Sequence, residues 1–407
     1  MKPAYKNSVR SRSDLMTLLT EACELEHGLA CSYLYAAFSL KQDLSEGGLT
    51  WQQLHQVKKW AAQLYLVASQ EMFHLAQAWN LLNAIGGSPY YLRPNFPQKS
   101  NYYPLGLPLV LEPFGVSSLK RFILYELPSH LDERHYVRSE MGYVSEDLYE
   151  YKTVGELYGM IRQGFVDLSA QTDLFVGDPR LQVGQELIDF PEIVKITNVA
   201  SAVAGIEKIM EQGEGNSYQD VDSHYGIFKA LLHEFEQEGR EAGSAFRPVR
   251  QAITNPVVQL KGDYRADRGH YITNEFTAEV ADIFDDVYNL MLRSLHFLFS
   301  TPVQDPGMQR DLARFSIAVM PMVVKPLGDA LMRLPAGRLY PGKVAGPAFS
   351  MSRHVVLPFA ERGACRVIAE RFDELTLRME AAATHPQGPL LLRAVLQNMK
   401  RLKNYLP

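Results

Sequence analysis

The fold of this chain is decided by a stretch that reads Leu64-Tyr65-Leu66-Val67-Ala68-Ser69-Gln70-Glu71-Met72-Phe73-His74-Leu75. It lies within an apolar stripe whose members recur at steps of three and four, namely Leu54, Val57, Ala61, Leu64, Ala68, Leu75, Ala78, Leu82 and Ile85. That spacing predicts a long helix with one buried face. Glu71 takes a position on the stripe where an apolar residue is expected, and His74 lies one turn further on nearly the same face.

A carboxylate on the buried face of a helix is unfavourable unless a partner compensates it. A metal ion is the simplest compensation, and Glu-x-x-His is the half-site that ferritin-like di-metal bundles use. The same motif also occurs by chance on solvated helices. The interpretation therefore depends on whether other helices supply matching carboxylates.

Other predicted helices do carry such groups. The helix predicted at 14–40 has the stripe Leu19, Ala22, Glu26, Leu29, Tyr33 and Ala37. The segment 192–212 has Ile193, Ile196, Ala200, Ala204, Glu207 and Glu211 on one face. A further helix is predicted to begin near Asp222, with His224, Phe228, Leu231 and Phe235 on one face. We therefore add Glu26, Glu207, Glu211 and His224 to the candidate ligands, although a single histidine on an apolar face is more often a hydrogen-bonded core residue.

Glu156 has two interpretations that its spacing does not separate. Thr153-Val154-Gly155-Glu156 matches the Thr-x-x-Glu capping box, which alone explains the glutamate. As a carboxylate at the start of a long helix, Glu156 also suits a metal cage. Helical spacing places Tyr33 near Glu26 and Tyr158 near Glu156. Each tyrosine could donate a hydrogen bond to a candidate ligand, take part in radical transfer, or simply belong to the core.

The number and type of these residues fit a known arrangement only in part. A four-helix di-metal site takes one Glu from each of two helices and Glu-x-x-His from each of the other two. The fourth contribution departs from this pattern, because Glu211 is followed at the third position by Glu214 and His224 lies beyond a glycine break. Mixed carboxylate and imidazole ligands favour iron or manganese over calcium, magnesium or a structural zinc.

The chain also carries several longer motifs. In chain order they are Leu25-Glu26-His27, Tyr33-Leu34-Tyr35, Glu71-Met72-Phe73-His74, Asn80-Leu81-Leu82-Asn83-Ala84-Ile85-Gly86-Gly87, Thr153-Val154-Gly155-Glu156-Leu157-Tyr158, Glu211-Gln212-Gly213-Glu214-Gly215, His224-Tyr225, Leu334-Pro335-Ala336-Gly337 and Ala345-Gly346-Pro347-Ala348-Phe349. Together they resemble the ferritin-like iminophenyl-pyruvate dimer synthase family, which includes an enzyme of violacein-type pigment pathways. The resemblance covers most of the chain.

This resemblance implies a ligand set and a substrate class. The implied ligands are Glu26, Glu71, His74, Glu156, Glu211 and His224. Glu207 fits the apolar-face pattern at least as well as Glu211, so both stay candidates. We expect two iron ions, with manganese as the alternative, and an amino-acid-derived small molecule of secondary metabolism as the substrate.

Composition excludes several other classes of protein. The chain has 407 residues, a net charge of −5 and a pI near 6.1, which argues against a nucleic-acid or membrane-surface partner. It has no apolar stretch long enough for a transmembrane helix, and the N-terminal residues do not resemble a signal peptide. Cys23 and Cys31 lie eight residues apart on one predicted helix, too far apart to form a disulfide. We therefore expect a cytoplasmic protein, and leave open whether it forms a homo-oligomer.

The predicted organisation is mainly α-helical. Residues 1–243 are expected to form a ferritin-like four-helix bundle with every candidate ligand, and residues 244–407 a helical region that supports it. The predicted function is a di-iron oxidase or oxygenase that uses O₂ on the small molecule. The alternatives are a ferritin-like protein that binds or oxidises iron without an organic substrate, and a metal-free helical scaffold.

Overall fold

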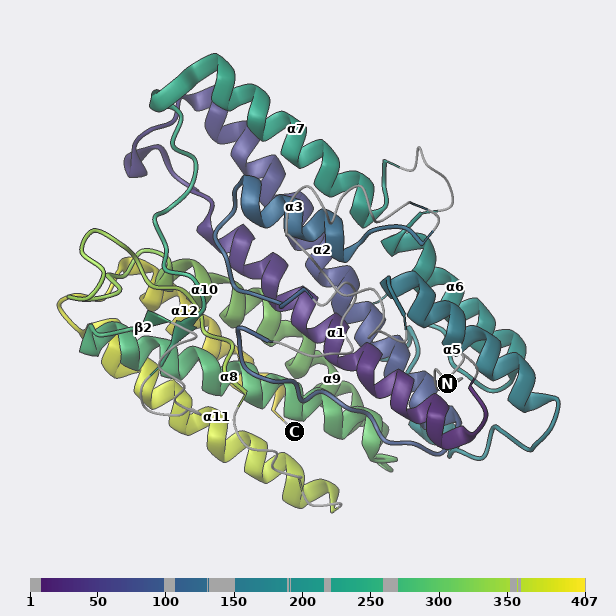
Figure 1. Cartoon of the computed structure of the whole chain (residues 1–407). Coiled ribbons are helices and arrows are strands. Elements are labelled where there is room, and N and C mark those ends of the chain that lie inside the picture. The colour runs from purple at the N-terminus through teal and green to yellow at the C-terminus, as the bar shows by residue number, and fades with distance from the viewer. Residues whose placement is uncertain are drawn as a thin grey trace.

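The computed structural model describes residues 9–98, 107–129, 131, 151–188, 190, 192–215, 221–258, 270–351, 357 and 360–406. Two long antiparallel helices, α1 (Arg12–Ser39) and α2 (Trp51–Ala84), lie against each other through the middle of the molecule (Figure 1). Almost every other described element is helical, so the prediction of a mainly α protein is confirmed.

Local sequence explains both ends of α2. Thr50 and Gln53 form a reciprocal capping box at its start, which satisfies two backbone N–H groups. At its end, Gly86 adopts φ +81°, a conformation that glycine takes without strain, and Gly87 N–H donates to Leu82 O. The side chains of Asn80 and Asn83 donate to Val183 O and Phe299 O, each at 2.8 Å. The Asn-Leu-Leu-Asn motif therefore anchors α2 to a loop and to the second half of the chain.

Two helix pairs complete the bundle around α1 and α2. At one end α3 (Val116–Tyr125) packs against α7 (His224–Ala242), and at the other end α5 (Val154–Ser169) packs against α6 (Val199–Gly213) (Figure 1). The third and fourth positions of the bundle are thus each filled by two shorter helices. Both interruptions fall near the middle of α1 and α2, where Glu26 and Glu71 lie.

The predicted apolar face of the segment 192–212 is wrong. The helix begins only at Val199, after the Asn198 cap, so Ile193 and Ile196 precede it. Its buried residues are Ala202, Gly205, Ile206 and Ile209. Because Ile193 and Ile196 lie outside the helix, they do not mark its buried face, and Glu207 and Glu211 lie on the exposed side of α6.

The second half consists of α8 (Glu275–Ser300), α9 (Pro306–Val319), α10 (Lys325–Leu331), α11 (Glu361–Thr384) and α12 (Leu390–Leu402). A π-helical turn, Met320–Val324, joins α9 to α10. Short 3₁₀ turns lie at Leu44–Glu46, Pro179–Leu181, Gly243–Ala245 and Lys403–Tyr405. Strands β1 (Pro256–Val257) and β2 (His270–Tyr271) pair in parallel, with Pro256 opposite His270.

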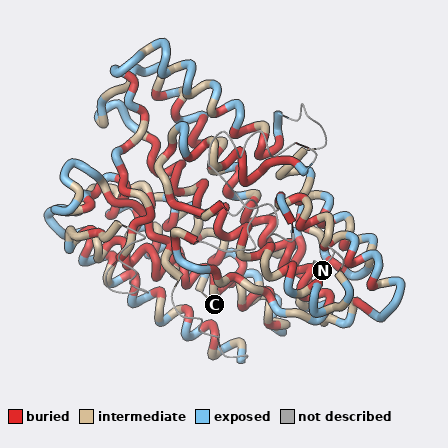
Figure 2. The backbone as a smooth tube through the Cα atoms, viewed as in Figure 1, coloured by how far each residue is buried: buried red, intermediate tan, exposed pale blue. Residues whose placement is uncertain are grey.

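The second half packs closely on the first. Buried residues run from α1 and α2 into α8 and α10 without an exposed gap between them (Figure 2). Arg250 ties the two parts together, because its guanidinium lies 2.6 Å from Glu46 and 2.5 Å from Asp329 and also donates to Phe38 O. None of the described helices has both the length and the apolar character required to cross a membrane.

Candidate metal centre

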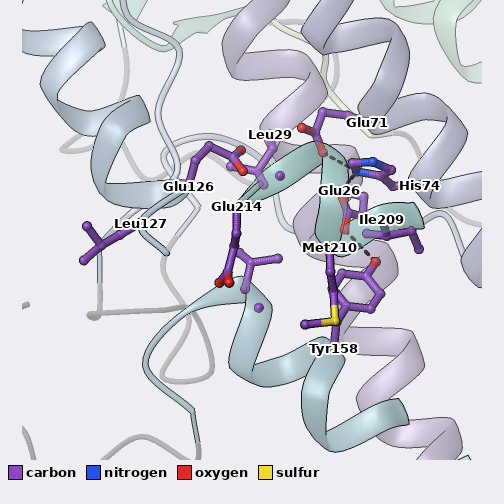
Figure 3. Close-up of a pocket in the computed structure, with 13 residues that line it drawn as sticks. Glu26, Leu29, Glu71, His74, Glu126, Leu127, Tyr158, Ile209, Met210 and Glu214 are labelled. Carbon is purple, nitrogen blue, oxygen red and sulfur yellow. Dashed lines mark hydrogen bonds and ion pairs between the residues drawn. The ribbon is translucent and has the colours of Figure 1, made fainter. Parts of the chain in front are cut away.

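Five buried side chains converge at the interruptions of the bundle. Glu26 comes from α1, and Glu71 and His74 come from α2. Glu126 directly follows α3, and His224 is the first residue of α7. Each is less than 5% exposed, and Figure 3 shows four of them around one pocket. The end of α3 and the start of α7 therefore lie beside the middle of the two long helices, where the other three side chains are.

These side chains form two groups that share Glu71. One group is Glu26, Glu71 and His74, and the other is Glu71, Glu126 and His224, with ligand atoms within 4.8 Å of one another in each. His74 Nδ1 lies 3.3 Å from Glu71 Oε2 and 3.3 Å from Glu26 Oε2. His224 Nδ1 lies 2.9 Å from Glu71 Oε1 and 3.6 Å from Glu126 Oε2. The two oxygens of Glu71 thus face different groups.

The centre contains polar atoms whose hydrogen bonding is incomplete. Glu71 Oε1 and His224 Nδ1 are close together, but their alignment does not make a hydrogen bond, and neither has another hydrogen-bond partner among the described residues. Leaving such atoms unpaired in the interior is costly. A cation bound by both of these atoms would satisfy them, so the residues present fit a metal.

Both histidines are oriented by a glutamine on their far side. His74 Nε2 lies 3.0 Å from Gln212 Oε1, and His224 Nε2 lies 3.2 Å from Gln70 Oε1. An amide oxygen only accepts hydrogen bonds, so it favours the tautomer with the proton on Nε2. When the ring is neutral, Nδ1 is then a lone pair that faces the carboxylates, as a metal ligand requires.

The outer carboxylates are each held by a tyrosine. Tyr158 from α5 donates to Glu26 Oε1 at 2.6 Å, and Tyr33 from α1 donates to Glu126 Oε1. In both cases the tyrosine holds Oε1, and Oε2 is the oxygen nearest the histidine. Burial, together with the adjacent carboxylate, raises the pKa of both phenols, so they remain hydrogen-bond donors at neutral pH.

The buried charges perturb one another strongly. Burial, followed by the charge of Glu71, raises the pKa of Glu26 to about 8. Burial alone would raise the pKa of Glu71, but its hydrogen bond with Glu26 and the two histidines lower that pKa. Burial disfavours protonated His224, but Glu71 and Glu126 outweigh it and raise its pKa to about 9. Without a metal the cluster therefore holds protons, which a bound cation would displace.

A small pocket, with about 20 Å³ of free volume, opens onto this centre. Its walls combine apolar side chains from several elements with four glutamates (Figure 3), and the complete lining is Glu26, Leu29, Glu71, His74, Glu126, Leu127, Val154, Gly155, Tyr158, Ile209, Met210, Gly213 and Glu214. Glu214 accepts hydrogen bonds from the backbone and hydroxyl of Ser129, each at 3.1 Å. Gly155 leaves space for this carboxylate, because a Cβ there would lie 1.8 Å from Glu214 Oε1.

Three residues predicted as ligands lie outside the cluster. Glu156 accepts the backbone N–H of Lys152 at 2.7 Å, while its own N–H donates to Thr153, so it serves the N-terminus of α5. Glu207 pairs with Arg162 at 3.0 Å on the surface. Glu211 pairs with Lys208 at 3.0 Å, also on the surface.

Glu126 is the site residue that the sequence interpretation missed. Leu119, Phe122 and Ile123 precede it at seven, four and three residues, so it continues the apolar stripe of α3. The same signal singled out Glu26 and Glu71. Gln70 and Gln212 could not be identified in the same way. A glutamine close to a candidate ligand in sequence is common, and its contact with a histidine is visible only in the folded structure.

The comparisons with known proteins agree with the helical fold described above. A family model described as ferritin-like matches residues 19–233. A solved structure of a ferritin-like protein from Caulobacter vibrioides superimposes with a TM-score of 0.53 at 17% identity, covering 84% of this chain and 99% of that chain. That level of identity supports the fold only.

Two curated proteins are also similar. Dichlorochromopyrrolate synthase of Lentzea aerocolonigenes is 27% identical over 427 aligned residues, covering 95% of this chain and 41% of the relative. 2-Imino-3-(indol-3-yl)propanoate dimerase of Chromobacterium violaceum is 27% identical over 372, covering 85% of this chain and 34% of the relative. The chain therefore spans less than half the length of either relative.

Proposed function

The chain belongs to the ferritin-like family, and from this premise we propose that it is a di-metal oxidase or oxygenase, with iron as the metal and manganese as the alternative. One observation carries the proposal. Glu71 presents one oxygen to each of two groups, and each group contains a further glutamate and a histidine. Such a shared carboxylate between carboxylate and imidazole ligands suits a pair of transition-metal ions.

The roles of the chain's own residues follow from their contacts. Glu26, Glu71 and His74 would hold one ion, and Glu71, Glu126 and His224 the other. Iron bound there would supply the redox chemistry with O₂ that protein side chains lack. Tyr158 and Tyr33 fix the outer carboxylates, and the apolar walls of the pocket limit the access of water.

The apolar part of the pocket lining, and not its small free volume, supports an organic substrate over iron storage. Leu29, Leu127, Val154, Ile209 and Met210 give it apolar walls next to the candidate ligands. Its lining contains no Lys or Arg, so an anionic group of a substrate would find positive charge only at the metals. Both curated relatives are named as enzymes that make or couple pyrrole or indole compounds. An amino-acid-derived aromatic small molecule of secondary metabolism is accordingly the substrate class we propose.

Metal content tests the proposal directly. We expect about two iron or manganese ions per chain in wild type and a loss of both ions in Glu71→Gln, because that carboxylate serves both groups. Glu207→Gln is the matched control, since it makes the same change on the surface. Less than about a tenth of an ion per wild-type chain after anaerobic iron loading would exclude the di-metal centre and favour the metal-free scaffold.

A second assay separates the enzyme from an iron-binding protein. Iron-loaded protein is supplied with amino acids and their imines, and both O₂ uptake and loss of the organic compound are measured. Substrate loss coupled to O₂ uptake supports the oxidase or oxygenase. Oxidation of iron alone, with every compound unchanged, would favour the ferritin-like iron-oxidising alternative.

Two further proposals concern the location of the protein and the division of the chain. We propose a cytoplasmic location, because Cys23, Cys31 and Cys365 are all buried free thiols, which suit a reducing compartment. We also propose that residues 1–243 and 244–407 act as a metal-binding bundle and its support.

A further inference from the structure

A second, entirely apolar hollow lies beside the metal-binding helix. It is lined by nine residues: Met72, Leu75, Ala76, Trp79, Ile188, Phe190, Leu295, Phe299 and Met320. The first four come from α2, two precede α6, two come from α8, and Met320 begins the π-helical turn. The hollow therefore forms where the second half of the chain packs against α2.

The chemistry of this lining excludes most ligands. Eight of the nine side chains contain only carbon or carbon and sulfur. The ninth, Trp79, uses its indole N–H on Tyr90 O at 2.7 Å. A water molecule needs two or more polar partners, so apolar hollows of this kind stay dry and accept small apolar molecules instead. The free space suits a single small molecule, not an aromatic one.

The hollow is also connected to the metal centre by direct packing. Met72 and Leu75 immediately follow Glu71 and His74 on α2. The ring of Phe190 lies 6.4 Å from that of Phe73, which lies edge-on to the His74 imidazole at 5.5 Å. One turn of α2 thus separates an apolar hollow from a candidate ligand.

One wall of the hollow is suited to movement. Met320 is an unbranched, partly exposed side chain at the first position of a π-helical turn that also contains Pro321. π-turns interrupt regular helix packing, and methionine adopts several conformations at little cost. Met320 is therefore the wall residue through which a small molecule would enter the hollow with the least disturbance of the helices.

We propose that this hollow binds dioxygen and supplies it to the metal centre. The inference rests on the proposed function, because only a centre that uses O₂ needs such a supply. Dioxygen is small and apolar, so it partitions into dry apolar space that water leaves empty. The hollow lies on the side of α2 that packs against the second half of the chain. Its lining shares no residue with the lining of the substrate pocket, so dioxygen and substrate would reach the metal centre from different sides.

Xenon is the probe for the hollow itself. Crystals of wild type under xenon pressure should show one xenon atom between Ala76 and Leu295. Ala76→Leu and Leu295→Phe fill the space from opposite walls and should abolish that xenon. Ala62→Leu, on an exposed position of the same helix, should retain it. No xenon there in wild type, or xenon retained in both filled variants, would overturn the proposal.

Reaction with O₂ tests the supply. The variants are loaded with iron(II) and mixed with limiting O₂, and iron oxidation is followed by absorbance. We expect the second-order rate to fall about fivefold or more in the two filled variants, with iron content unchanged. Equal rates in wild type, Ala62→Leu and both filled variants would refute the supply. If loaded wild type fails to react with O₂ at all, the proposed function itself is wrong.

Discussion

Replacing Glu126 by glutamine should remove one of two metal ions and leave the other. Glu126 belongs only to the group with Glu71 and His224, whereas Glu26, Glu71 and His74 remain complete. Loss of a residue that merely orients a ligand costs about 10–100-fold in metal affinity. Loss of a direct anionic ligand should exceed that range, which is more than about 2.7 kcal/mol for the affected ion. The content should therefore fall from about two ions to about one.

The assay is a competitive titration with a coloured chelator, combined with elemental analysis after desalting. Glutamine keeps the size of the side chain and an oxygen that accepts from Tyr33, so the variant should fold as wild type does. Circular dichroism of the variant and of wild type would check this. Glu156→Gln and Glu211→Gln are matched controls, because both carboxylates lie outside the cluster, and they should retain both ions.

Two results would refute the reasoning. If Glu126→Gln keeps two ions with wild-type affinity, Glu126 is not a ligand. If Glu156→Gln or Glu211→Gln instead loses an ion, the ligand set implied by the family resemblance is right, and the grouping around Glu71 is incomplete.

Other consequences of the structure can be measured separately. Tyr158→Phe removes the hydrogen bond to Glu26 and should weaken one ion by roughly 10–100-fold in calorimetric titration, and an unchanged affinity would contradict that role. Burial raises the pKa of Asp285 to about 8, so wild-type stability should fall as the pH rises from about 4 through 8. Asp285→Asn has no charge to bury, so its free energy of unfolding should exceed that of wild type by up to about 5 kcal/mol near pH 9 and by nothing near pH 4. A difference between variant and wild type that does not change with pH would contradict this. Arg250→Met leaves Glu46 and Asp329 with only the more exposed Arg333 as a shared partner and should cost about 2–3 kcal/mol, reduced from the fully buried case by that remaining partner and by partial exposure. An unchanged melting temperature would exclude that contribution.

The parts of the site on long helices were predictable because their signal is local. Glu26 and Glu71 interrupt apolar stripes that are many turns long, and His74 lies one turn from Glu71. In a helix of that length the register cannot shift without exposing the whole face. His224 was also found, because Phe228 and Leu231 continue its face in α7.

The parts near helix ends were harder to predict. Thr153-Val154-Gly155-Glu156 fits a cap and a ligand equally well in sequence, and the observed contact with Lys152 favours the cap. α6 begins later than expected, so Ile193 and Ile196 do not belong to it and do not define its buried face, and Glu207 lies at the surface. Helix ends depend on capping and on neighbouring chain segments, which periodicity does not report.

The sequence by itself determined the helical class, the buried faces of the two long helices and the candidate ligands that interrupt them, because each of these depends on residues a few positions apart. Only the tertiary structure decided that Glu126 and His224, 98 residues apart, meet each other beside Glu71, in one group with it. It likewise decided that two glutamines and two tyrosines orient the cluster. Those contacts join separate elements, and their positions follow from how the helices pack, not from the order of residues within any one of them.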